Sequence, residues 1–201
     1  MSSDAIVLDA VGLSFPNSKS FVSAIKNLVS KSNDDFTALK DINLTVRTGE
    51  VFGLIGKNGS GKSTILRIIA GIYAADSGIC KIRGSTSLLA GLGTGFSQHQ
   101  TGVENALLYG SILGHTEAEM RKLLPEIIKF SELGDFINKP LRTYSAGMKA
   151  RLGLAVASAI CPDILLIDEV LGVGDPQFRE KSKQRILELV KKTGTVVIVS
   201  H

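Results

Sequence analysis

The sequence predicts an α/β protein built around a mostly parallel β-sheet, and three observations support this prediction. Short apolar runs such as Ile164–Ile167 are typical of strands that are buried on both faces. Segments with apolar residues at helical spacing, such as 177–192, alternate with these runs. A glycine-rich turn joins another apolar run, Val51–Ile55, to a helix. Strands that alternate with helices favour a parallel sheet with right-handed crossovers.

The composition is that of an ordinary globular chain. Of its 201 residues, 44% are hydrophobic and 21% are charged, which argues against intrinsic disorder, a collagen-like fibre and a coiled coil. The net charge of +4 suits a polyanionic ligand or an anionic membrane surface. No apolar run is long enough to span a bilayer, and the first residues lack the basic segment of a secretory signal. Cys80 and Cys161 are far apart in sequence, so we expect reduced thiols in a cytosolic protein, with neither a disulfide nor a zinc site.

The amino-terminal part of the chain is predicted to contain two strands with an insertion between them. The strands are 6–15 and 38–46, and the second alternates apolar and polar residues as a half-buried strand does. The intervening residues, 16–36, exceed the length of a plain hairpin loop. Apolar residues at helical spacing with lysines between them predict a short amphipathic basic helix there. These residues are Phe21, Ile25, Leu28, Val29, Lys19, Lys26 and Lys31.

The rest of the chain alternates strands with helices, apart from a long helical stretch at 101–159. The expected strands and helices are 51–55, 63–70, 78–83, 87–92, 164–167, 177–192 and 195–200. The expected breaks in the helical stretch are Gly110, Gly114, Pro125, Gly134 and Pro140. We therefore expect a core formed by residues 1–97 and 161–201, a helical lobe at about 98–160 and an insertion at 16–36.

Residues 56–63 match the phosphate-binding pattern GxxxxGK followed by Ser or Thr, between a predicted strand and a predicted helix. The glycines let successive N–H groups point at phosphate oxygens, and the helix N-terminus adds its positive dipole. Lys62 should reach the β- and γ-phosphates, the Ser63 hydroxyl should hold Mg²⁺, and Thr64 supports the same turn. The predicted phosphate-binding residues are Gly56, Lys57, Asn58, Gly59, Ser60, Gly61, Lys62, Ser63 and Thr64.

Two carboxylates follow the apolar run Ile164–Ile167 directly, at the end of a strand where ligands bind in open α/β sheets. Asp168 is placed to hold the Mg²⁺ shell. Glu169 is placed to orient or deprotonate an attacking water. Together with the glycine-rich loop, this pair predicts hydrolysis of a nucleotide.

Residues 144–148, with the sequence YSAGM, begin a predicted helix that runs to about residue 159. They resemble a variant of the LSGGQ signature of the ATP-binding cassette (ABC) family, and they precede Asp168 and Glu169 as in that family. The resemblance implies a P-loop NTPase of the ABC type, with a RecA-like core of mostly parallel sheet, an amino-terminal antiparallel β part and an inserted α-helical lobe. It also implies that Ser145 and Gly147 face the γ-phosphate of an ATP bound by a second subunit, so that a head-to-tail homodimer encloses two ATP molecules.

The same resemblance assigns further residues. Asp175, in the sequence Val-Gly-Asp, looks like the D-loop that bridges the two sites, and His201 matches the switch histidine that contacts the γ-phosphate. Phe15 lies where the family places an aromatic residue against adenine, although such a residue also fits the core. The family's Q-loop glutamine has no match, since Gln98 and Gln100 come too late in the chain. The chain ends directly after a predicted strand, which suggests a truncated nucleotide-binding domain.

The departures from the common ABC pattern resemble one subgroup, the ATPase subunits of O-antigen, capsule and wall teichoic acid exporters. The shared features are Gly95-Phe96, the sequence TGVEN at 101–105, the YSAGM signature, the pattern from Asp168 to Phe178, and the insertion at 16–36. This resemblance implies an ATPase that powers export of a lipid-linked polysaccharide through a separate integral membrane permease. Such a subunit lies peripherally at the cytoplasmic face of the inner (plasma) membrane, and we expect no nucleic-acid partner.

Two other functions are considered: an ABC importer ATPase and a DNA- or ribosome-associated ABC ATPase. Importer subunits usually carry the common signature and Q-loop, both of which are altered here. The DNA- and ribosome-associated class usually has a coiled-coil insertion or two cassettes in one chain, and neither occurs in this sequence. For the insertion at 16–36, two roles are considered as well: a cap on the edge of the core, or a contact with the permease or an anionic lipid head group.

Overall fold

The computed structural model describes residues 3–16, 35–93, 95–168 and 176–200. The chain forms two compact units. The first contains the described residues up to 48 together with 55–83, and the second contains 49–54 together with the described residues from 84 to 200. Within the described residues, no helix is both long and apolar enough to cross a membrane.

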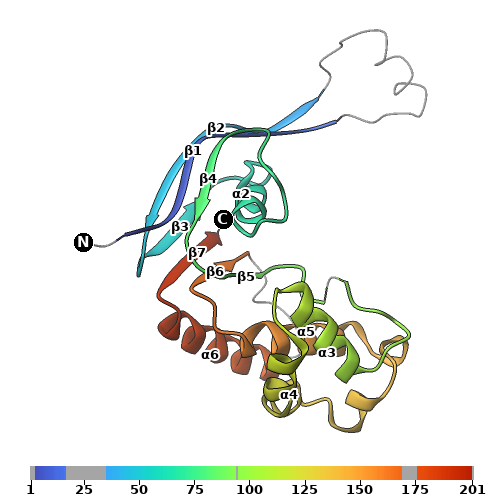
Figure 1. Ribbon diagram of the computed structural model, residues 1–201. Helices are drawn as coiled ribbons and strands as arrows, with labels where there is room; N and C mark the ends of the chain where they lie inside the picture. Colours follow the sequence, from blue (N-terminus) through green and yellow to red (C-terminus); the bar gives the residue numbers. More distant parts are fainter. Residues whose placement is uncertain (1–2, 17–34, 94, 169–175, 201) are drawn as a thin grey trace, which may run out of the picture. The chain divides into compact units, whose positions relative to one another are not determined.

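The first unit is a three-stranded antiparallel sheet with one helix (Figure 1). Its strand order is β2-β1-β4, with β1 at Asp4–Phe15, β2 at Phe36–Arg47 and β4 at Ser77–Ile82. Helix α2, at Lys62–Ile69, packs on β2 and β4. The predicted antiparallel amino-terminal part is thus confirmed. Phe36, which we assigned to the insertion, belongs to β2 because it pairs with the last residue of β1. The rest of the predicted basic helix, at 17–34, lies outside the described residues.

The second unit contains a four-stranded sheet in the order β3-β7-β6-β5. The strands are β3 (Val51–Ile55), β5 (Thr86–Leu89), β6 (Ile164–Ile167) and β7 (Thr195–Ser200). Both pairings of β6, with β5 and with β7, are parallel and in continuous register. All four residues of β6 are buried. The predicted parallel sheet with a fully buried central strand is therefore confirmed.

Two predicted strands differ from the structure. We expected β3 to be buried on both faces, but Val51 and Ile55 are 59% and 80% exposed. The exposed residues Val51, Gly53 and Ile55 alternate with the partly buried Phe52 and Leu54, so the exposure lies on one face of β3, which an apolar run alone does not reveal. The strand expected at 87–92 ends at Leu89. It ends there because Gly91 and Gly93 adopt left-handed backbone conformations (φ 56° and 83°) that a strand does not continue.

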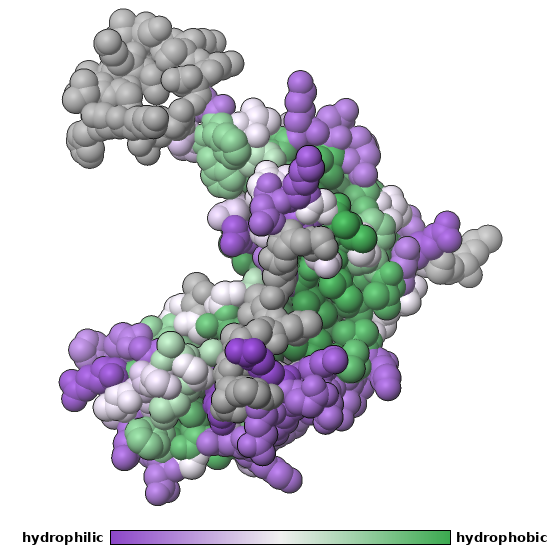
Figure 2. All heavy atoms as spheres, turned by 180° about the vertical axis from the view of Figure 1, so that it is seen from behind, coloured by the Kyte–Doolittle hydropathy of each residue, from purple (hydrophilic) through white to green (hydrophobic). Residues whose placement is uncertain are grey.

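The long helical stretch forms three helices and two short 3₁₀ turns. These are α3 (Gly102–Ile112), α4 (Glu117–Ser131), η1 (Gly134–Asn138), η2 (Leu141–Thr143) and α5 (Ala146–Ala159), and α6 (Pro176–Lys192) follows β6. Figure 2 shows hydrophilic residues gathered over α6, in keeping with its many charged residues. Figure 1 shows α3, α4 and α5 gathered beside the carboxyl-terminal helix α6, in the same unit as the parallel sheet.

Three of the five expected breaks lie at helix boundaries, and the other two do not. Gly110 lies inside α3, where a Cβ atom would come within 2.4 Å of the Met120 Cγ, so this glycine allows α3 and α4 to approach each other. Pro125 lies inside α4 on an exposed face. A proline removes one helical hydrogen bond, but the residues on both sides of Pro125 remain helical. The prediction of breaks at Gly110 and Pro125 was wrong for these reasons.

Candidate functional site

The phosphate-binding pattern forms a tight loop at the start of α2. Gly59 and Gly61 have φ values of 79° and 87°, a conformation that residues other than glycine rarely adopt. A Cβ atom on Gly61 would lie 2.6 Å from the Leu39 Cδ2, so the loop also approaches β2 too closely for a side chain. Gly61 is the N-cap residue of α2 and provides no side-chain cap. The start of this helix thus has no side-chain cap from its N-cap residue, as is typical of loops that bind phosphate at a helix N-terminus.

Lys62 is the only buried residue among the predicted phosphate-binding residues, and 7% of its surface is exposed. Its Nζ donates hydrogen bonds to the carbonyl oxygens of Gly56 (2.6 Å) and Lys57 (2.9 Å). The Ser60 N–H also donates to the Lys57 carbonyl, at 3.2 Å, which closes the turn. The Lys62 ammonium group is thus held in place by two carbonyl groups of the same loop. This geometry is that of an anion-binding loop with a built-in cation.

Ser63 and Thr64 are partly buried in the first turn of α2, which contains no acidic residue. A hydroxyl oxygen at this position is a ligand that Mg²⁺ accepts. Asp168, the second predicted metal ligand, follows β6 in the other unit. Its backbone N–H donates to the Leu89 carbonyl at 3.3 Å, which places Asp168 at the carboxyl end of the central strand, as predicted. Among the described residues, no group of three or more His, Cys, Asp and Glu could hold a metal by itself.

The YSAGM segment forms the N-terminus of α5. Ser145 is the N-cap residue, and its Oγ accepts a hydrogen bond from the Met148 N–H at 3.2 Å. The first turn of α5 has no acidic residue, and Lys149 follows in the helix. A cavity of about 490 Å³ opens beside this turn. Its lining residues are Glu132, Leu133, Phe136, Ser145, Gly147, Met148 and Arg151. The predicted pair Ser145 and Gly147 therefore lies together at an open helix N-terminus.

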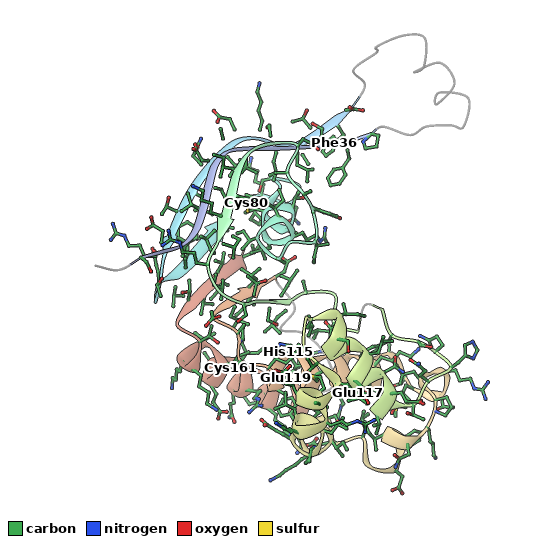
Figure 3. The ribbon with its side chains drawn as sticks, in the orientation of Figure 1. Phe36, Cys80, His115, Glu117, Glu119 and Cys161 are labelled. Carbon is green, nitrogen blue, oxygen red and sulfur yellow. The ribbon has the colours of Figure 1, made fainter. Side chains whose placement is uncertain are left out.

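Phe15 lies at the end of β1, partly buried. Its ring contacts Tyr73 edge-on, with ring centroids 5.5 Å apart, and its register partner across the sheet is Phe36. Phe36 is 64% exposed and is the first residue of β2 (Figure 3). Sequence reasoning did not single out Tyr73 or Phe36, because only the folded sheet brings them to Phe15. Stacking of Phe15 on adenine stays a prediction.

Three predicted site residues, Glu169, Asp175 and His201, lie outside the described residues. Gln98 is exposed, and its Oε1 accepts a hydrogen bond from the Lys149 Nζ at 2.9 Å. The residue that most clearly escaped sequence reasoning is Asn105, which is fully buried within the TGVEN motif. A buried amide is a signal that sequence alone does not provide.

His99, His115, Cys80 and Cys161 do not belong to any cluster of metal-ligand residues among the described residues. His99 is exposed, and the Nδ1 of His115 lies 3.8 Å from the Glu119 Oε2 at the start of α4 (Figure 3). Cys80 and Cys161 are exposed and form no disulfide with each other.

A glycine loop with a buried lysine at a helix N-terminus, in an α/β chain with a parallel sheet, defines a phosphate-binding α/β protein. The sequence profile of the ABC transporter family matches residues 39–172, more than half of the chain. The chain therefore belongs to the ABC transporter family. This confirms the family resemblance on which the site residues were assigned.

Individual relatives agree with the exporter subgroup. The chain is 52% identical over 165 residues to the O-antigen export system ATP-binding protein RfbB of Myxococcus xanthus, covering 82% of this chain and 38% of that protein. It is 41% identical over 179 residues to the teichoic acids export ATP-binding protein TagH of Bacillus cereus, covering 88% of this chain and 32% of that protein. The chain thus spans about a third of the length of these two relatives.

A solved structure shares the fold. The ATP-binding cassette MJ0796, in a dimeric post-hydrolysis state with ADP and phosphate, matches with a TM-score of 0.72 and 25% identity. The match covers 98% of this chain and 88% of that one. The predicted cassette fold, with a mostly parallel sheet, an antiparallel sheet and a helical segment, is confirmed.

Proposed function

We propose that this chain is the ATP-hydrolysing subunit of an ABC exporter that moves a lipid-linked polysaccharide of the O-antigen, capsule or teichoic acid type through a separate permease. The observation that carries this proposal is the loop at 56–63, with two left-handed glycines and the buried Lys62, in a chain of the ABC family. Relatives named for O-antigen and teichoic acid export support the substrate class.

The phosphate loop binds the triphosphate of ATP through backbone N–H groups and the Lys62 ammonium. Mg²⁺, when bound, neutralises charge on the phosphates. Ser63 and Asp168 would hold it, because a hydroxyl and a carboxylate are oxygen donors of the kind that Mg²⁺ prefers. Since the described residues offer no metal cage of protein ligands alone, phosphate oxygens would complete the shell. Phe15 would stack on the adenine.

Hydrolysis requires residues from two copies of the chain. Glu169 orients or deprotonates the attacking water, and His201 contacts the γ-phosphate. Ser145 and Gly147 of the second copy present the N-terminus of α5 to the same phosphate, and Asp175 links the two sites. The exposed N-terminus of α5, without an acidic residue in its first turn, supports this role because it attracts anions. The active form is therefore a homodimer that encloses two ATP molecules.

The subunit would act at the cytoplasmic face of the inner (plasma) membrane, peripherally, through its contact with the permease. To test the function, the gene is deleted and replaced by the wild-type sequence or by Lys62→Ala, and surface glycan is measured together with its lipid-linked precursor. We expect wild type to restore surface glycan, and Lys62→Ala to leave the precursor inside the cell. Normal surface glycan with Lys62→Ala would contradict the proposal. If the strain with Lys62→Ala kept its surface glycan but lost uptake of a solute, the protein would be an importer ATPase.

A further inference from the structure

The TGVEN motif at 101–105 has no role in the function proposed above, yet it makes a dense set of contacts. It begins α3 with a capping box. The Thr101 Oγ1 accepts a hydrogen bond from the Glu104 N–H at 3.2 Å, and the Glu104 Oε2 accepts from the Thr101 N–H at 2.7 Å and from its Oγ1 at 2.8 Å. The hydrogen bonds from the Thr101 backbone N–H and hydroxyl lower the pKa of Glu104, so the carboxylate stays ionised. The start of α3 is fixed in this way.

Asn105, the last residue of the motif, holds the preceding loop with its side chain. It is fully buried. Its Oδ1 accepts a hydrogen bond from the Ser97 N–H at 2.7 Å. Its Nδ2 lies within 3.1 Å of three carbonyl oxygens, those of Ser97, Gln100 and Thr101. One amide therefore shapes the whole loop at 97–101, and neither an aliphatic nor an acidic side chain can make these bonds.

The loop at 97–101 in turn holds the chain on both sides of the YSAGM segment. Before that segment, the Gln98 and Gln100 carbonyls accept hydrogen bonds from the N–H groups of Arg142 (2.9 Å) and Leu141 (3.0 Å). After it, the Lys149 Nζ donates to the Gln98 Oε1 at 2.9 Å. Both ends of the segment that contains Ser145 and Gly147 are thus attached to the loop that Asn105 shapes.

Gly102 and Tyr144 make a further contact between the two motifs. A Cβ atom on Gly102 would lie 2.4 Å from the Tyr144 hydroxyl and 2.8 Å from the Ile137 carbonyl oxygen. The Tyr144 hydroxyl donates to the Phe136 carbonyl at 2.5 Å, and burial raises the pKa of Tyr144, so it remains a donor at neutral pH. Only glycine leaves room for this tyrosine. The motifs TGVEN and YSAGM are therefore parts of one structure.

We propose that the TGVEN motif positions the phosphate-facing turn of α5, with Asn105 and Gly102 as its principal positioning residues and Gln98 as the link to Lys149. The inference rests on the proposed function, in which Ser145 and Gly147 contact ATP held by a second copy. A displaced turn harms only the steps that need two chains. Binding of ATP to the phosphate loop of a single chain, which lies in the other unit, stays intact.

The experiment measures three quantities for each variant: affinity for a fluorescent ATP analogue, ATP-dependent dimerisation, and the kcat and KM of hydrolysis. In Asn105→Asp, a carboxylate replaces the amide donors that face the three carbonyls. We expect its kcat to fall about 10- to 100-fold, as a misplaced catalytic element produces. Because Gln98 is exposed, the variant Gln98→Leu should fold normally. It removes the hydrogen bond to Lys149 and should lower kcat about two- to tenfold. For both variants, affinity of the single chain for the analogue stays at the wild-type value.

The chain offers a matched control in its second capping box, at the start of α4. The Thr116 Oγ1 accepts from the Glu119 N–H at 3.3 Å, and the Glu119 Oε2 accepts from the Thr116 N–H and Oγ1 at 2.9 Å each. Thr101→Ala and Thr116→Ala remove the same cap and should destabilise the protein equally. Only Thr101→Ala should impair dimerisation and hydrolysis.

Equal effects of the two threonine variants, or wild-type kcat in Asn105→Asp and Gln98→Leu, would overturn the inference. A parallel loss of analogue binding would overturn it too. If Asn105→Asp does not fold, Gln98→Leu and the threonine pair decide the question. A wild-type protein that neither dimerises with ATP nor hydrolyses it would instead contradict the proposed function, so the two failures are distinguishable.

Discussion

Helices α2 and α5 both present an N-terminus to phosphate in the proposed mechanism, but they are built differently. Helix α2 begins at a left-handed glycine without a side-chain cap and has a buried lysine as its first residue. Helix α5 begins at Ser145, whose Oγ already accepts from one of the first N–H groups, at Met148. We expect the first arrangement to bind an anion by itself. In the second, the Ser145 side chain already occupies one N–H group and the first turn contains no buried cation, so we expect it to act on a phosphate that is already bound elsewhere.

The largest effect on this comparison is expected from Lys62→Ala, which removes the cation of the α2 loop. The affinity of the single chain for ATP should fall about 10- to 100-fold, because a charged hydrogen-bond donor to phosphate is lost. Lys81→Ala, at an exposed site on β4, changes the net charge equally and serves as the control. Titration with a fluorescent ATP analogue measures both. Equal affinities for the two variants would remove Lys62 from the binding site.

A smaller and different effect is expected from Ser145→Ala. It should lower kcat and ATP-dependent dimerisation about tenfold, because the cap of α5 and a phosphate contact are lost together. Affinity of the single chain for ATP should not change. Ser111→Ala, an exposed serine in α3, is the control. If Ser145→Ala weakened single-chain binding as Lys62→Ala does, the contrast between the two helices would be wrong.

The smallest effect concerns pH, since α3 and α4 start with carboxylate caps whereas α2 and α5 do not. Hydrogen bonds from Thr101 lower the pKa of Glu104, and hydrogen bonds from Thr116 lower the pKa of Glu119. In both cases the bond from the backbone N–H has the larger effect on the pKa and the bond from the hydroxyl the smaller one. A lowered folded-state pKa adds stability above the pKa of the unfolded chain, and this stability is lost as pH falls through the folded-state pKa. Urea unfolding should therefore show a decrease in stability in acid. The decrease should be smaller in the double variant Glu104→Gln and Glu119→Gln; an unchanged decrease would contradict the role of these caps.

Much of the site was predictable because its residues act locally. The loop at 56–63 and the position of Asp168 depend on a strand, a turn and a helix start that follow one another in sequence, and such signals survive without the fold. The exposure of Ile55 was not predictable, because an apolar run does not show which face of a strand is covered. Likewise, the role of Gly110 depends on Met120 in a neighbouring helix.

The TGVEN motif shows the same limit more clearly. The resemblance to a subgroup singled it out, but its contacts depend on the fold. Gly102 of the motif lies against Tyr144. Gln98 of the loop before the motif bonds Arg142 and Lys149, so these contacts join segments that are distant in the chain. The polar contacts of the buried Asn105 amide likewise become visible only when the loop before α3 is folded. A motif without a chemical signature can thus contact a predicted site segment through packing and hydrogen bonds that the sequence does not reveal.

The most direct test of ATP hydrolysis by a two-chain site is the variant Glu169→Gln, compared with wild type in the presence of ATP and Mg²⁺. Because Glu169 acts only on the water, turnover should fall about 100-fold or more, as general-base removal produces, while affinity for ATP stays unchanged. Size-exclusion chromatography should then show an ATP-dependent dimer of Glu169→Gln that reverts to monomer when ATP is omitted. Unchanged turnover in Glu169→Gln, or a monomer with and without ATP, would contradict the account.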